Sequence, residues 1–321
     1  MKFLAFFASA FLLISSAVAD QQAVSALTLL NKMGEAIKSS NYFGTLIYTH
    51  DGHVESLKII HKMDEKGESQ RIVHLTGAAR EVIRKDDVVT CYMPDSQSVF
   101  VGERRFNNHL LARLSQNFKE FASQYDFKID GTGRVAGRET TIVAIQPKDN
   151  YRYGYRFWID NDSHLLLKSD LLDASNKVLE QLMFVDISVG TDITQDMLKP
   201  AIDGKSFTWH RGSDKPMEKS VGSNSGWQIK NLPIGFSVKD RSKQKMPNSD
   251  ELVDYLFVSD GLATISVYIE KFGVDNKGYV GTSQMGAVSI YGSLLDDYHV
   301  TVVGEAPQGT VKMIADSISH Q

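Results

Sequence analysis

The sequence of 321 residues contains one cysteine, Cys91, which excludes an intramolecular disulfide as a source of stability. Stability must therefore come from the burial of a hydrophobic core. Valine residues surround Cys91 on an expected strand, and this favours a small buried side chain over a reactive thiol or an intermolecular bridge. Hydrophobic residues make up 42% of the chain and charged residues 23%, which fits an ordinary globular protein.

The sequence also lacks an excess of positive charge. Its 35 Lys and Arg residues and 39 Asp and Glu residues give a formal net charge of -4. A generally basic nucleic-acid-binding protein is therefore excluded, and we expect no nucleic-acid partner.

Only one long apolar run is present, over residues 3–14, and it is shorter than the roughly 20 residues that span a bilayer. Lys2 precedes the run, and Ala17-Val18-Ala19 follows it as a cleavage signal. This order is typical of a signal peptide, which we place at residues 1–19, although an uncleaved anchor or a buried first helix is an alternative. We expect an exported mature protein that does not itself span the membrane.

Recognisable catalytic and metal-binding motifs are missing. The nine histidines form no H-E-x-x-H pair. Asp160-Asn161-Asp162 begins like a calcium loop, but Leu165 and Leu171 occupy the places of its glycine and its closing acid. There is no G-x-S-x-G sequence. We therefore expect a binding protein without enzymatic activity, metal or cofactor.

The part of the chain that follows is rich in strand signals. Apolar residues at helical spacing predict a first helix over residues 23–40. A second amphipathic helix, or two short ones, is expected between Glu103 and Tyr125. The turn at Asp51-Gly52 is typical of a β-hairpin. The expected strands cover residues 45–49, 54–61, 71–75, 81–84, 88–93, 98–101, 127–130, 140–147, 151–159, 165–172 and 178–189.

These elements predict an α+β fold with one long antiparallel sheet, which can close, leave one face in water, or curl around its helices. We expect the last of these, a half-open β-barrel that covers its helices. Such a sheet leaves an apolar cavity that suits an acyl chain or a peptide. The alternative for each candidate below is that it belongs to ordinary sheet core. The candidate lining residues are Leu46, Tyr48, Leu57, Ile59, Tyr153, Tyr155 and Phe157.

A stretch rich in Gly, Ser, Asp and Lys after residue 210 is typical of a linker. We expect an N-terminal domain over residues 20–205, a linker over 206–226 and a smaller C-terminal α+β domain over 227–321. The second domain should contain an antiparallel sheet and one helix over residues 310–319.

Two further groups of residues are candidates for binding. Four arginines near the middle strands and the second helix could pair with the phosphates or sugar acids of a lipid headgroup, or could form a solvated face. They are Arg80, Arg84, Arg104 and Arg105. For a protein partner, the candidates are strand residues of the second domain: Leu256, Phe257, Val258, Ile265, Val267 and Ile269.

Several stretches, in order along the chain, carry a family resemblance. They are Asn41-Tyr42-Phe43-Gly44-Thr45 with Gly52 and Val54-Glu55-Ser56-Leu57, Ala79-Arg80-Glu81-Val82, Tyr125-Asp126-Phe127 with Gly133-Arg134, Tyr151-Arg152-Tyr153 with Trp158-Ile159-Asp160, Lys168-Ser169-Asp170-Leu171-Leu172-Asp173 with Leu179-Glu180-Gln181, Leu232-Pro233 with Gly235-Phe236, Ser259-Asp260-Gly261-Leu262, and Val302-Val303-Gly304-Glu305. Together they resemble the RseB/MucB family of periplasmic regulators of the envelope-stress sigma factor.

The resemblance implies an N-terminal domain like those of the lipoprotein carriers LolA and LolB. It also implies binding to the periplasmic part of a membrane-anchored anti-sigma factor of the RseA or MucA type. Bound protein would shield that factor from a DegS-type protease, and lipopolysaccharide or another lipid would release it. The alternatives are a general periplasmic lipid or lipoprotein carrier and an unrecognised hydrolase.

Overall fold

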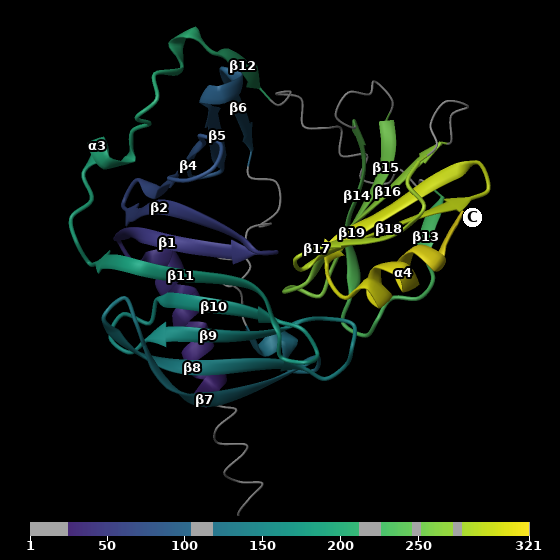
Figure 1. Cartoon of the computed structure of the whole chain (residues 1–321), viewed down its shortest axis with the longest axis horizontal. Helices are drawn as coiled ribbons and strands as arrows, with labels where there is room; N and C mark the ends of the chain where they lie inside the picture. Colours follow the sequence, from purple (N-terminus) through teal and green to yellow (C-terminus); the bar gives the residue numbers. More distant parts are fainter. Residues whose placement is uncertain (1–24, 104–117, 212–225, 246–251, 272–277, 321) are drawn as a thin grey trace, which may run out of the picture.

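The structure is a computed structural model that describes residues 25–103, 118–211, 226–245, 252–271 and 278–320. Two large antiparallel sheets dominate it, one of twelve strands and one of six (Figure 1). No helix within these ranges is long and apolar enough to cross a membrane.

The first sheet is antiparallel except at one edge, where β12 pairs parallel with β6. Residues 208–211, which we expected in the linker, therefore extend this sheet. In spatial order its strands are β12 (Thr208–Arg211), β6 (Ser98–Glu103), β5 (Val88–Met93), β4 (Glu81–Lys85), β3 (Gly67–His74), β2 (His53–Asp64), β1 (Tyr42–His50), β11 (Val178–Val189), β10 (Leu166–Leu172), β9 (Gly154–Asp160), β8 (Arg138–Pro147) and β7 (Tyr125–Val135).

A helix over residues 25–39 crosses one face of this sheet (Figure 1). Its apolar side buries Leu30 and Met33, and both are completely shielded from solvent. They join one core with inward residues of β1, β2, β8 and β9, such as Leu46 and Phe157. The expected curled sheet packed on a helix is thus confirmed. Of the second expected helix, residues 104–117 lie outside the described ranges, and residues 118–121 form the short helix η2 (Phe118–Phe121).

The opposite face of the sheet carries a different cover. After β11 the chain runs back over β1, β2, β3 and β4 as a segment that we name the strap, residues 190–207. It contains the short helices α3 (Gln195–Leu198) and η3 (Gly204–Ser206). Ile193 and Leu198 of the strap pack on Ile60, and Arg71 donates a hydrogen bond to the Met197 carbonyl at 3.0 Å. The two faces of the sheet are therefore covered by different elements.

The second sheet packs on one helix, α4 (Gln308–Asp316), as expected for the smaller domain. The residues between them form a separate core that includes Val267, Val302 and Ile314. A short pair of strands, β13 (Trp227–Ile229) and β20 (Ile318–His320), joins the two ends of this domain. In spatial order the sheet contains β14 (Ser237–Lys245), β15 (Leu252–Ser259), β16 (Thr264–Lys271), β19 (Tyr298–Glu305), β18 (Val288–Leu295) and β17 (Gly281–Met285).

Candidate functional site

A row of side chains, apolar except for the last, crosses the first sheet from its core to its open edge, and we name it the helix-side row. Residues directly opposite each other on paired strands point to the same face. The pairing runs from Ile59 through each neighbouring strand to β12. The row consists of Ile59, Ile72, Val82, Cys91, Phe100 and His210.

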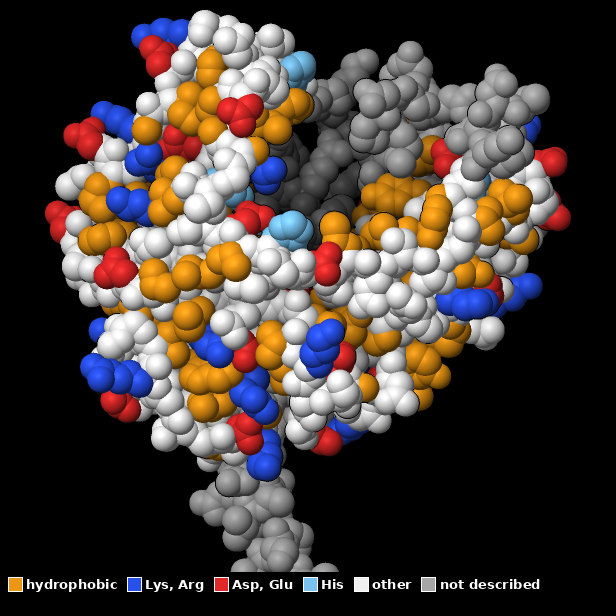
Figure 2. Space-filling view, viewed as in Figure 1, with side chains coloured by type: hydrophobic (Ala, Val, Ile, Leu, Met, Phe, Trp, Pro, Cys, Tyr) orange, Lys and Arg blue, Asp and Glu red, His pale blue; other side chains and the backbone are white. Residues whose placement is uncertain are grey.

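Exposure increases along this row. Ile59 is 1% exposed and belongs to the core beneath the helix over residues 25–39, whereas Phe100 is 45% exposed and stacks on the His210 ring with 4.7 Å between centroids. Figure 2 shows the surface hollowed between this half of the first sheet and the second domain. The row therefore offers apolar area to a ligand, and it contains Cys91, whose thiol pKa burial raises.

Most of the predicted cavity residues do not lie on open surface. Leu46, Tyr153, Tyr155 and Phe157 are buried in the same core as Ile59. These five residues form ordinary sheet core, so their prediction as the lining of an open cavity is corrected. The reason is that the helix over residues 25–39 fills this half of the sheet. Tyr48 and Leu57 are only half-buried.

The predicted arginine cluster is also divided. Arg84 is buried and forms an ion pair with Glu68, which also lies 3.1 Å from the Nε2 atom of His61. Burial lowers the pKa of His61. Arg80 is exposed on the loop before β4, and Arg104 and Arg105 lie outside the described residues. Arg84 thus already has a carboxylate partner and is not available on the surface as predicted.

The predicted partner surface of the second domain is wrong for this structure, because all six residues are buried. β15 and β16 are interior strands of their sheet, and α4 covers the face that carries Leu256 and Val267. Phe257, on the other face of β15, is also only 7% exposed. An apolar run on a strand does not reveal from sequence alone whether another layer covers it. The corrected residues are Leu256, Phe257, Val258, Ile265, Val267 and Ile269.

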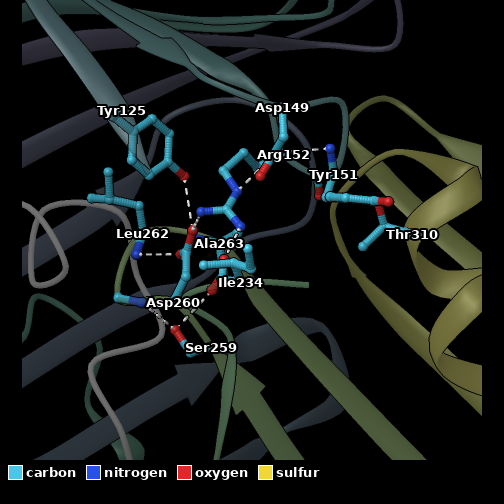
Figure 3. Close-up of polar contacts among 11 residues, drawn as sticks. Tyr125, Asp149, Tyr151, Arg152, Ile234, Ser259, Asp260, Leu262, Ala263 and Thr310 are labelled. Atoms are coloured by element: carbon cyan, nitrogen blue, oxygen red, sulfur yellow. Dashed lines mark hydrogen bonds and ion pairs between the residues drawn. The ribbon is translucent and has the colours of Figure 1, made fainter. Parts of the chain in front are cut away.

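The two domains meet at a buried ion pair that sequence reasoning missed (Figure 3). Arg152, just before β9, faces Asp260 in the β15–β16 hairpin, with Nη1 3.1 Å from Oδ2 and both side chains completely buried. The same guanidinium donates to the Ile234 carbonyl at 2.7 Å and lies 3.3 Å from Asp149. Its carbon stands 4.8 Å from the centroid of the Phe236 ring. Arg152 is thus bound to several parts of the second domain at once.

The Asp260 carboxylate is held from both domains. The Tyr125 hydroxyl donates to Oδ2 at 3.1 Å, and the backbone N–H groups of Leu262 and Ala263 donate to Oδ1 at 3.0 and 2.8 Å (Figure 3). Burial raises the pKa of Asp260, and the Arg152 guanidinium and these donors oppose the rise. Burial and the nearby Asp260 raise the pKa of Tyr125, so its hydroxyl stays protonated.

The tip of the β15–β16 hairpin also packs into the first domain. Leu262 is 1% exposed and belongs to the core of the first domain. Gly261 has a φ of +107°, and a Cβ atom there would overlap the Phe121 ring of η2. Only glycine combines this backbone conformation with so close an approach. We name Ser259–Ala263 the hairpin plug.

A second contact between the domains lies near the start of β11. Glu180 accepts a hydrogen bond from the Tyr48 hydroxyl at 2.7 Å and a longer one, 3.4 Å, from the Ala287 backbone. Burial, and then Glu180, raise the pKa of Tyr48 above its usual range, so this phenol acts as a donor. Ala287 is completely buried against the core of the first domain. Thr310 of α4 adds a bond to the Tyr151 carbonyl at 2.9 Å.

Within the described ranges, no three His, Cys, Asp or Glu side chains are grouped so that they could hold a metal ion. The sequence signals of the junction were present, as a hairpin at Ser259-Asp260-Gly261 and an aromatic stretch around Arg152, but only the fold brings the two together.

Known proteins are similar to this chain in sequence. A family model described as the MucB/RseB N-terminal domain matches residues 25–202, and one described as the MucB/RseB C-terminal domain matches residues 221–319. The Sigma-E factor regulatory protein RseB of Haemophilus influenzae is 30% identical over 310 residues, which cover 96% of each chain. The Sigma factor AlgU regulatory protein MucB of Pseudomonas aeruginosa is 32% identical over 309 residues, which cover 94% of this chain and 93% of that protein.

Solved structures agree along nearly the whole length. The complex of Pseudomonas aeruginosa MucA and MucB matches with a TM-score of 0.74 at 28% identity, covering 92% of this chain and 99% of that one. A crystal structure of MucB matches with a TM-score of 0.64 at 27% identity, covering 93% of this chain and 98% of that one. With both domain models and these relatives matched, the chain belongs to the MucB/RseB family.

Proposed function

We propose that this protein is a periplasmic negative regulator of a sigma-E-type envelope-stress response. It binds the periplasmic segment of a membrane-anchored anti-sigma factor of the RseA or MucA type and protects that segment from regulated proteolysis. The observation that carries the proposal is the match, at a TM-score of 0.74 and over 92% of the chain, to MucB in a structure that also holds MucA.

The geometry supports a binding role for the region between the domains. The helix-side row reaches the exposed Phe100 and His210 at the open edge of the first sheet. The surface is hollowed between this half of the sheet and the second domain (Figure 2). Partly exposed apolar rows next to polar rims are typical of ligand grooves. A segment of the anti-sigma factor bound here would be covered by the protein and so withheld from a protease.

We further propose that lipopolysaccharide or another lipid releases the partner. The helix-side row accepts acyl chains by the same apolar contacts that accept a peptide. A lipid that binds the free protein more tightly than the complex must lower the affinity for the partner. By linkage, the partner lowers the affinity for the lipid by the same factor. This reciprocity makes the release proposal measurable from either side.

The experiment that tests the function is a protection assay. Purified mature protein is added to the periplasmic segment of the anti-sigma factor together with a site-1 protease of the DegS type. The proposal predicts that cleavage slows in proportion to the fraction bound, and that lipopolysaccharide restores the rate. Unchanged cleavage at saturating protein would contradict it.

The exposed apolar row also fits a general lipid or lipoprotein carrier. Native mass spectrometry separates the two functions. Stoichiometric transfer of a lipoprotein to an acceptor, without binding of the anti-sigma segment, would favour the carrier.

A further inference from the structure

The contacts between the two domains differ in the groups that form them. At the hairpin plug, a completely buried ion pair, a buried leucine and a glycine without room for a Cβ atom all coincide. At the Glu180 contact, the bond to the second domain measures 3.4 Å. The plug therefore joins the domains through a buried ion pair, whereas the Glu180 contact joins them through a hydrogen bond and the buried Ala287.

We propose that the hairpin plug is the pivot that orients the second domain, and that Arg152 is the positioning residue that holds the plug in place against the first domain. We also propose that the anti-sigma segment binds tightly only when the plug is held there. The last part rests on the proposed function. The first two parts concern the free protein alone.

The contacts of the Arg152 side chain support its positioning role. Its guanidinium contacts three groups on two segments of the second domain: the Asp260 carboxylate in the β15–β16 hairpin, and the Ile234 carbonyl and the Phe236 ring in the loop before β14. Tyr125 lies on the other side, with its ring centroid 5.5 Å from the guanidinium carbon. The hydrogen bond from Nη2, the ion pair from Nη1 and the two ring contacts hold a planar, always charged group, and together they constrain its orientation as well as its distance.

Loss of the contacts between Arg152 and the hairpin plug should also affect partner binding at a distance from the plug. The helix-side row lies on β2 to β6 and β12, away from the plug, with the hollow between this half of the sheet and the second domain (Figures 1 and 2). A small rotation about the plug therefore changes the width of that hollow more than it changes the junction itself. Contacts of the anti-sigma segment that involve both the first sheet and the second domain would therefore weaken together.

The test measures the orientation of the domains and partner affinity in the same variants of the full chain. Spin labels are placed at Val88→Cys on β5 and Leu294→Cys on β18, both exposed positions, with Cys91→Ala to remove the native thiol. Electron–electron double resonance then gives the distance distribution between the domains. Fluorescence anisotropy gives the affinity for a labelled anti-sigma periplasmic segment.

Arg152→Met and Asp260→Asn are compared with a matched control, Arg138→Met. Arg138 also pairs with a buried aspartate, Asp160, but entirely within the first sheet. We expect the two junction variants to broaden the distance distribution and to weaken binding at least tenfold, whereas Arg138→Met changes neither. If Arg152→Met does not fold, Asp260→Asn and Tyr125→Phe, which keep the size of the side chain, supply the same two readouts.

An unchanged distance distribution in the folded junction variants would overturn the pivot. A broadened distribution with unchanged affinity would overturn the requirement for a seated plug. Failure of the unsubstituted protein to bind the segment would instead overturn the proposed function, and the distances in the free protein would still decide the role of Arg152.

Discussion

Gly261 and Phe121 approach each other so closely across the domain boundary that the Phe121 ring occupies the space of a Cβ atom at position 261. Their contact joins the β15–β16 hairpin of the second domain to η2 of the first. It makes the fit between the domains sensitive to a single methyl group.

The first prediction concerns this glycine. Gly261→Ala adds a clash with Phe121 to the cost of about 1–2 kcal/mol for an alanine at positive φ. Gly131→Ala is the matched control, because Gly131 has a similar φ of +116° with open space around it. We expect Gly261→Ala to lower the free energy of unfolding by about 1–3 kcal/mol more than the control does, measured by urea denaturation. Equal losses would show that the contact with Phe121 contributes nothing.

The second prediction concerns acid stability. Arg138 holds the Asp160 carboxylate with two hydrogen bonds of 2.9 and 2.8 Å, and Ser163 adds two more. Burial favours a higher pKa, but the bonds from Arg138 and Ser163 prevail and hold the pKa of Asp160 below its usual range. The folded state therefore binds this proton less tightly than the unfolded state, and its contribution is complete above the ordinary aspartate pKa of about 4.

That contribution should be lost as the pH falls through the lowered pKa of the folded state. Asp160→Asn should reduce stability at neutral pH and flatten the decrease in unfolding free energy below about pH 4. The control is Asp162→Asn, since Asp162 is 89% exposed and lies 3.5 Å from the same arginine. Urea titrations at a series of pH values measure this, and an unchanged acid slope in Asp160→Asn speaks against the assignment.

The third prediction concerns the strap. Glu81 is 1% exposed, accepts the Ala201 backbone N–H at 3.0 Å and pairs with Arg71. Glu81→Gln should weaken this attachment by roughly 1–3 kcal/mol, since hydrogen bonds to charged groups are the stronger ones. Hydrogen exchange at the Ala201 amide should accelerate accordingly. Glu65→Gln, on an exposed turn, should leave that amide protected, and equal exchange in both variants would refute the role of Glu81.

The fourth prediction separates the two faces of the open edge. Phe100 and Trp209 are 45% and 44% exposed on paired strands. Phe100 belongs to the helix-side row, whereas Trp209 lies against Tyr92 on the face that carries the strap. Phe100→Ser should weaken binding of the anti-sigma segment about tenfold, as expected for an aromatic contact worth more than 1 kcal/mol. Trp209→Ser should change it less than threefold. The opposite order would place the site on the strap face.

Local signals predicted much of this fold. Asp51-Gly52 marks the turn between β1 and β2, where both residues have positive φ, and alternation around Tyr155 and Phe157 identified an inward face of β9. The helix over residues 25–39 follows its apolar spacing. Each of these features depends on neighbours within a few residues.

Long-range features were not predictable in the same way. Nothing local to Arg152 indicates that Asp260 lies opposite, and β12 joins β6 only because the strap returns the chain to that edge. The apolar runs of β15 and β16 look alike whether solvent or another layer covers them. For the same reason five predicted cavity residues proved to be core, while the exposed end of the helix-side row was missed.

The proposed function requires that this protein holds an anti-sigma segment against an apolar surface between its domains. The most direct test is fluorescence anisotropy of a labelled periplasmic anti-sigma segment, titrated first with the purified mature protein and then with lipopolysaccharide. We expect a saturable rise in anisotropy that Phe100→Ser weakens, and a return toward the value of the free segment as lipopolysaccharide is added. A flat titration with correctly folded protein would contradict it.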